Sequence, residues 1–157
     1  MVVNKCVEQG IYVVLILSLE KDHRPLRSSE LSTILDVSDS YLKKILRKLV
    51  VAGIVTSSPG KEGGFQLARS VTEISLYDVY TALEGKECEL KMTGIGSRIF
   101  TRGKEFAEEE EKVVRAFDRA NEAFGNELRS MFLSELLSEE YFLYGTVEFE
   151  ALLKKQE

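Results

Sequence analysis

The chain has 157 residues, 44% of them hydrophobic and 30% charged, and its net charge at pH 7 is −5. This balance is typical of a globular protein with one ordinary domain, or a small domain with a helical arm, and excludes a disordered chain. No apolar run reaches the roughly 20 residues that cross a bilayer, and the N-terminal segment does not resemble a signal peptide. Because Cys6 and Cys88 are the only cysteines, we expect no disulfide framework and a cytoplasmic location.

The negative charge is unevenly distributed. Residues 1–85 hold ten Lys or Arg and ten Asp or Glu, so the remaining residues carry the whole excess of five acidic groups. Between Ser40 and Arg69 there are six cationic side chains and one carboxylate, Glu62. A phosphate backbone responds to charge within about 8–10 Å, so this segment stays compatible with a nucleic-acid partner despite the acidic total.

The first third of the chain predicts two helices. The first spans residues 6–19 and stops before Pro25, because proline cannot extend a helix and disfavours helix in the residue before it. Ser28 and Ser29 are candidate N-caps for the second, short helix. Its apolar residues have the spacing of one buried helix face; they are Leu31, Ile34 and Leu35.

A third helix is predicted over residues 40–52, with Ser38 or Asp39 as its N-cap and Gly53 just beyond its end. Its apolar residues lie at i, i+3, i+4 and i+7 and therefore form one stripe. These residues are Leu42, Ile45, Leu46 and Leu49. The cationic residues lie off the stripe, on exposed faces; they are Lys43, Lys44, Arg47 and Lys48.

Two short strands, residues 54–58 and 65–69, are predicted to form a β-hairpin whose tip, residues 59–64, is rich in glycine. A fourth helix is capped by Ser75 and ends at Gly85. Helix, tight turn, helix and hairpin follow one another in the order of a winged helix-turn-helix. Residues 1–85 are therefore predicted to be one such domain, in a mainly α fold with a small β-hairpin wing.

The hydrophobic residues of segment 86–103 show no helical or strand periodicity, and the segment is predicted to be an irregular linker. Residues 104–157 are predicted to be a helical dimerisation region and tail, with a long helix from Lys104 to about Leu137 and an apolar tail that packs back on the protein. Apolar residues of the helix alternate steps of three and four, as in a coiled coil. This predicted dimerisation seam consists of Val113, Phe117, Ala120, Phe124, Leu128 and Met131.

The third helix is the candidate DNA-reading element, because a helix anchored by a leucine stripe presents its other side to the major groove. An exposed basic helix is often only a solvated surface. Here the hairpin that follows directly, with a lysine at its tip, favours DNA binding. The candidate DNA-contacting residues are Ser38, Ser40, Tyr41, Lys43, Lys44, Arg47, Lys48 and Lys61.

Several motifs follow one another in order, at residues 38–49, 52–55, 63–69, 74–79 and 84–85. Together they resemble the Rrf2 family of winged helix-turn-helix transcription regulators, which govern iron–sulfur assembly, nitric-oxide response and cysteine metabolism. The resemblance implies a bacterial homodimer, acting as a repressor, on a palindromic operator. It also implies that the third helix enters the major groove and that the hairpin lies at the minor groove.

The chain departs from that family in three places. Many members bind an iron–sulfur cluster through three linker cysteines, whereas this linker has Cys88 alone, so we expect no cofactor and no metal site. The family wing commonly carries an arginine before its Gly-Pro, but here Ser57-Ser58-Pro59-Gly60 stands instead, leaving Lys61 as a weaker substitute. Lys43 stands where relatives often have an acidic or amide residue, which predicts a different operator sequence.

Other functions are less well supported by the residues. Cys88 lies between two glutamates that raise its thiol pKa, which favours a quiet thiol over a redox sensor, and His23 lies in a polar loop. No cluster of nucleophile, base and oxyanion donors appears, so we expect no enzyme. A winged helix used only for protein contacts remains the alternative. An effector, small molecule or protein, would be expected at the linker, the long helix or the tail.

Overall fold

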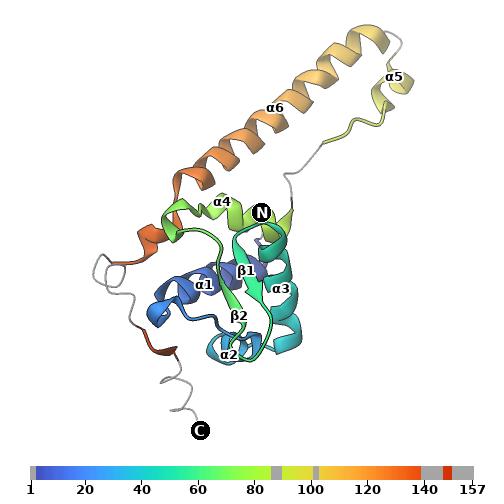
Figure 1. Ribbon diagram of the computed structural model, residues 1–157. Coiled ribbons are helices and arrows are strands. Elements are labelled where there is room, and N and C mark those ends of the chain that lie inside the picture. The colour runs from blue at the N-terminus through green and yellow to red at the C-terminus, as the bar shows by residue number, and fades with distance from the viewer. Residues whose placement is uncertain (1–2, 86–89, 101–102, 139–146, 150–157) are drawn as a thin grey trace. The chain divides into compact units, whose positions relative to one another are not determined.

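The computed structural model describes residues 3–85, 90–100, 103–138 and 147–149. They fall into two compact units, one formed by the described parts of residues 1–85 and 129–157 and the other by those of residues 86–128. The fold is mainly helical, with one β-hairpin and one long helix near the C-terminus (Figure 1). The predicted fold class, a winged helix-turn-helix followed by a long helix, is confirmed.

Four helices of the first unit enclose one apolar core. Each contributes side chains that are fully buried, including Val13, Leu31, Leu46 and Val79. Burying a leucine-sized side chain contributes about 1.5–3 kcal/mol, so this shared core fixes how the helices pack. The helices are α1 (Lys5–Leu19), α2 (Ser28–Ile34), α3 (Asp39–Val51) and α4 (Leu76–Glu84), with single 3₁₀ turns η1 (Lys21–His23) and η2 (Val71–Glu73) between them.

The ends of α3 follow the predicted signals. The Ser38 hydroxyl accepts a hydrogen bond from the Tyr41 N–H at 3.4 Å, and Gly53 follows the helix with φ at +68°, a value that favours glycine. The turn between α2 and α3 is tight, because Asp36 takes a left-handed φ of +51°, which Asp tolerates better than most residues. Together these residues set the helix-turn-helix.

The helix α2 begins differently from the prediction. Neither Ser28 nor Ser29 is its N-cap; that position is Arg27, and Ser28 is the first helical residue. The Arg27 N–H donates to a carboxylate oxygen of Glu30 at 2.7 Å. The glutamate three residues after the cap thus replaces the predicted serine hydroxyl as the group that fixes the start of the helix.

The hairpin, called the wing below, consists of the antiparallel strands β1 (Val55–Ser58) and β2 (Gly64–Leu67). It is attached to the loop before α2, since Leu26 and Phe65 exchange two backbone hydrogen bonds of 2.9 and 2.8 Å. A Cβ atom at Gly64 would lie 2.7 Å from the Leu26 carbonyl oxygen, so only glycine allows this close approach. The wing tip therefore lies next to the start of α2 (Figure 1).

The second unit contains the short helix α5 (Ile95–Ile99) and most of α6 (Gly103–Ser130). The prediction that residues 86–103 are irregular throughout was wrong at α5, which is too short to show a helical period in sequence. Phe100, which ends α5, stacks on Phe106 of α6 with ring centroids 4.1 Å apart. Among the described helices, none is both long and apolar enough to cross a membrane.

The long helix ends at Ser130, earlier than the predicted end near Leu137. The chain leaves the helix because backbone hydrogen bonds tie it to the start of α4 and to the segment just before it: the Leu76 N–H donates to the Met131 oxygen and the Leu133 N–H to the Ile74 oxygen. The described residues from 129 onward thus belong with the DNA-binding candidate unit, whereas the sequence predicted a division at residue 104. One 3₁₀ turn, η3 (Leu133–Leu136), follows.

The tail was predicted to pack back on the protein, and this is confirmed for residues 147–149. The Val147 N–H donates to the Leu19 oxygen at 3.1 Å, and Phe149 is buried in the core of the first unit. An ion pair of 2.6 Å between Lys21 and Glu148 lies alongside. Residues 141–144 of the predicted tail lie outside the described part.

We expect Gly64→Ala to lower the free energy of unfolding by about 1–3 kcal/mol, the usual effect of forcing an extra methyl group into packed structure. Gln66→Ala, on an exposed position of the same strand, is the matched control and should change little. Urea denaturation of both variants measures the difference. An unchanged midpoint for Gly64→Ala would show that the wing is not held against Leu26.

Candidate nucleic-acid interface

The face of α3 that points away from the core carries positive charge. Its apolar stripe is buried, whereas Ser40, Lys44 and Arg47, spaced by four and three residues, are exposed on one face. Lys44 and Arg47 make no hydrogen bond or ion pair with any residue that the structure describes. Two cationic side chains on a convex helix are thus available to an external anion.

The first turn of α3 presents hydroxyl groups. Ser38 and Ser40 are exposed, with their oxygens 3.5 Å apart. The Tyr41 side chain is half-buried and packs against the core, and its predicted contact with bases or phosphates stays a prediction. Hydroxyls at the N-terminal end of such a helix are suited to hydrogen bonds with phosphates or base edges.

Lys43 is paired within its own helix. Its ammonium lies 2.6 Å from the Asp39 carboxylate one turn earlier. The hydrogen bond with Lys43, together with one from Ser28, lowers the pKa of the Asp39 carboxyl below its usual range. Asp39 lies just outside the segment in which the sequence showed excess positive charge, so the free charge of Lys43 is smaller than the sequence alone indicates.

Lys48 turns away from the exposed face of α3. Its ammonium donates to the Leu83 carbonyl at 2.6 Å, one of the last carbonyls of α4. Such carbonyls lack helical partners, and a cation there is favourable. The structure therefore gives Lys48 a contact between two helices, and its predicted DNA contact stays a prediction.

The wing tip brings together Lys61 and a residue that the sequence did not indicate. Lys61 is exposed, and its carbonyl accepts a hydrogen bond of 2.6 Å from the guanidinium of Arg27. The two residues are 34 positions apart, so no local pattern reveals the contact. The only sign of this contact in the sequence is that an arginine, Arg27, stands directly before the predicted N-caps of α2.

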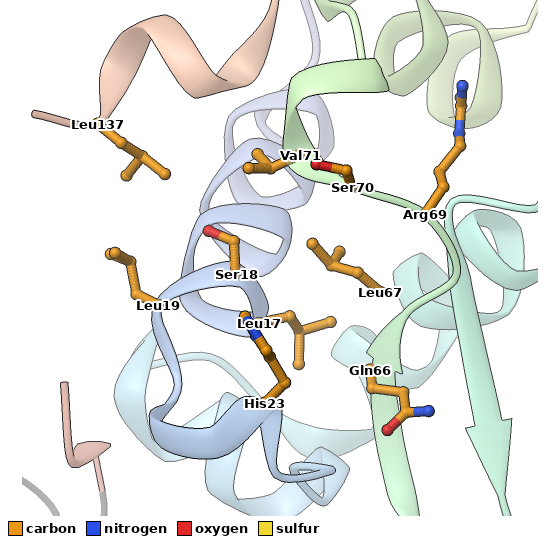
Figure 2. Close-up of a pocket in the computed structure, with 10 residues that line it drawn as sticks. All are labelled: Leu17, Ser18, Leu19, His23, Gln66, Leu67, Arg69, Ser70, Val71 and Leu137. Carbon is orange, nitrogen blue, oxygen red and sulfur yellow. The ribbon is translucent and has the colours of Figure 1, made fainter. Parts of the chain in front are cut away.

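A separate cleft of about 400 Å³ lies in the first unit between the end of α1, β2 and the segment after η3. Figure 2 shows Leu19 and Leu137 on one side of it and Leu67 on the other. Its polar side chains are largely engaged internally, since Arg69 bonds to the Glu73 carbonyl and pairs with Asp78. None of the predicted DNA-contacting residues lines this cleft.

Five of the six residues of the predicted dimerisation seam lie on α6, and one lies beyond its end. Val113 and Phe117 of α6 are 45% and 43% exposed, unusually large fractions for such side chains. Ala120 is exposed, while Phe124 and Leu128 are half-buried. The sixth residue, Met131, lies beyond the end of α6, half-buried, with its carbonyl bound to Leu76.

Comparison with known proteins places the chain in a family of regulators. Residues 3–139 match the Rrf2 family, described as iron-dependent transcriptional regulators. The HTH-type transcriptional regulators YffB of Lactococcus lactis and YwgB of Bacillus subtilis are 48% and 43% identical over 50% and 60% of this chain. The matched regions span 51% and 60% of these relatives, so the chain covers little more than half of their length.

Solved structures share the fold. The cysteine regulator CymR of B. subtilis superposes with a TM-score of 0.59 at 21% identity, covering 87% of this chain and 95% of that one. IscR of T. potens gives 0.56 at 22% identity, with 92% and 97% covered. Because the family model matches residues 3–139, the chain belongs to the Rrf2 family of helix-turn-helix transcriptional regulators.

We expect Lys48→Met to lower the free energy of unfolding by about 1 kcal/mol, because it removes the hydrogen bond to the Leu83 carbonyl but keeps the aliphatic stem. Lys44→Met, on the exposed face of the same helix, should leave stability nearly unchanged. Chemical denaturation compares the two. Equal stability of both variants would mean that the contact between α3 and α4 contributes nothing.

Proposed function

We propose that the protein binds a palindromic operator as a homodimer, with α3 in the major groove of each half-site. We base this proposal on Lys44 and Arg47, which are exposed and have no ion-pair partner among the described residues. They lie on the face of α3 opposite its buried apolar stripe. A major groove about 12 Å wide admits a helix, and lysine and arginine are the side chains that contact guanine and phosphates. The Ser38 and Ser40 hydroxyls supply neutral contacts at the leading end of the helix.

The wing extends this contact surface along the DNA. Lys61 at its tip is exposed, and it follows Gly60, whose φ of +100° gives the tight turn. A lysine at this place is suited to the backbone beside the minor groove. We place Lys43 and Lys48 in supporting roles, because the first is paired with Asp39 and the second with the Leu83 carbonyl.

The homodimer is proposed to form through α6. The helix has 28 residues, about 42 Å in length, and Val113 and Phe117 expose apolar surface that a second copy of the same helix would bury. Two-fold symmetry of such a dimer matches two-fold symmetry of a palindromic operator. A dimer seated on promoter DNA blocks access to it, and we therefore propose that the protein is a repressor.

We further propose that this member of the family works without an iron–sulfur cluster. A cluster needs about four ligands, usually cysteine thiolates, and this chain offers Cys6 and Cys88. Cys6 is half-buried on α1, and burial, with a smaller contribution from Glu84, raises the pKa of its thiol, which disfavours the thiolate that iron requires. In the described residues no three metal-binding side chains converge, and Cys88 lies outside that part.

The proposal is tested with duplex DNA that the protein selects from a random pool. We expect the double variant Lys44→Ala/Arg47→Ala to bind this DNA at least tenfold more weakly, since each lost contact costs about 1–3 kcal/mol. Lys5→Ala, an exposed cation at the start of α1, is the control. If the wild-type protein ignores duplex DNA even at low salt, the DNA-binding proposal fails and a module for protein contacts takes its place.

The dimer is tested by analytical ultracentrifugation. We expect the wild-type chain of 17.7 kDa to sediment as a dimer at micromolar concentration. Phe117→Glu places charge in the apolar seam and should give monomers, whereas Arg119→Glu, off the seam by helical spacing, should not. A monomeric wild-type protein, or an undisturbed Phe117→Glu dimer, would refute assembly through α6.

A further inference from the structure

A polar hollow of about 310 Å³ lies between the loop before α2 and the wing tip. It belongs to the first unit and is distinct from the cleft of Figure 2. Three cationic residues and two acidic ones line it; they are Arg24, Arg27, Lys61, Glu30 and Glu62. We call it the wing-tip hollow, and its chemistry depends on which of these charges are already paired.

Arg24 is shared by two glutamates. Its guanidinium bonds to Glu30 at 3.2 Å and to the buried Glu20 at 3.0 Å. Glu30 also accepts the Arg27 backbone N–H at 2.7 Å, so its carboxylate is committed on both oxygens, whereas one Glu20 oxygen is buried without a hydrogen-bond partner among the described residues. Arg24 is therefore engaged by internal acids and is not available to an external anion.

The Arg27 side chain is held in place without being neutralised. Its backbone follows Leu26, which is fixed to β2 by two hydrogen bonds, and one nitrogen of its guanidinium donates to the Lys61 carbonyl. A carbonyl carries no net charge, and among the described residues no carboxylate pairs with Arg27 or Lys61. The remaining N–H donors of Arg27 therefore border a hollow that also contains the Lys61 side chain, with Glu62 as the one exposed acid beside them.

We propose that the wing-tip hollow binds one phosphate of the DNA backbone, with Arg27 as its principal ligand and Lys61 as its second. The inference rests on the proposed DNA-binding function. A guanidinium fork matches two phosphate oxygens, and a side chain already positioned by the protein loses little conformational entropy when it binds. The hydrogen bond to the Lys61 carbonyl keeps the Arg27 guanidinium at the hollow, so we assign it a phosphate and not the base edges of the minor groove.

This site supplies the cation that the wing sequence lacks. Between Ser57 and Gly60 the strand end has no arginine, and Lys61 alone would present a single flexible ammonium. The guanidinium from the start of α2 adds a second, fixed positive charge at the same place. The phosphate contact is therefore built from two segments, the loop before α2 and the wing.

The test compares Arg27→Gln with the wild type, because glutamine keeps an N–H donor for the Lys61 carbonyl but removes the charge. Binding to the selected duplex is measured by fluorescence anisotropy between 50 and 200 mM salt. Losing one phosphate contact should lower the slope of log affinity against log salt by about 0.9. Between 50 and 200 mM salt, the affinity of the variant should therefore fall by a factor about threefold smaller than that of the wild type. Arg27→Lys keeps the charge without the fork and should retain the slope while binding more weakly.

Lys5→Ala should leave both affinity and slope unchanged and controls for the general loss of one positive charge. An unchanged slope for Arg27→Gln overturns the proposal, even if affinity falls, because a purely structural brace would behave in that way. A changed base preference next to the half-site also overturns it, since that is the sign of minor-groove reading. Failure of the wild type to bind duplex DNA would instead refute the underlying function.

Discussion

The buried leucine stripe of α3 is the constraint on which the rest of the DNA-binding unit depends. Leu42, Leu46 and Leu49 have no exposed surface, and they contact the core that α1, α2 and α4 enclose. A helix anchored along one side has no freedom to rotate about its axis without exposing that side. The orientation of Lys44 and Arg47 toward solvent is therefore a consequence of apolar packing on the opposite face.

The cations of this unit divide into two groups by what they contact. Lys43 is paired with Asp39 within α3, and Arg24 is paired with two glutamates. Lys48 directs its ammonium inward to the uncharged Leu83 carbonyl and so joins α3 to α4. Lys44, Arg47 and Lys61 leave their charges unpaired among the described residues. Counting charges along a sequence overestimates the positive surface, because it cannot separate these two groups.

Local signals predicted the elements well, and distant contacts explain what they missed. The hydroxyl of Ser38, Gly53 and the stripe of α3 act within one or two turns, so the sequence reveals them. The bonds of Lys48 to Leu83 and of Arg27 to Lys61 join residues 35 and 34 positions apart, and no periodicity encodes them. The end of α6 is similar: nothing near Ser130 breaks a helix, and only the hydrogen bonds of Met131 with Leu76 and of Leu133 with Ile74, at the start of α4, end it.

The backbone hydrogen bond between Leu76 and Met131 also marks the place where the chain returns to the first unit after α6. The first unit is discontinuous in sequence, so the second unit is an insertion that leaves it after Gly85 and returns at Arg129, where the guanidinium stacks 3.7 Å above the Tyr77 ring. Within the first unit, Arg129 and Met131 therefore meet the first turn of α4, the helix whose other end Lys48 joins to α3.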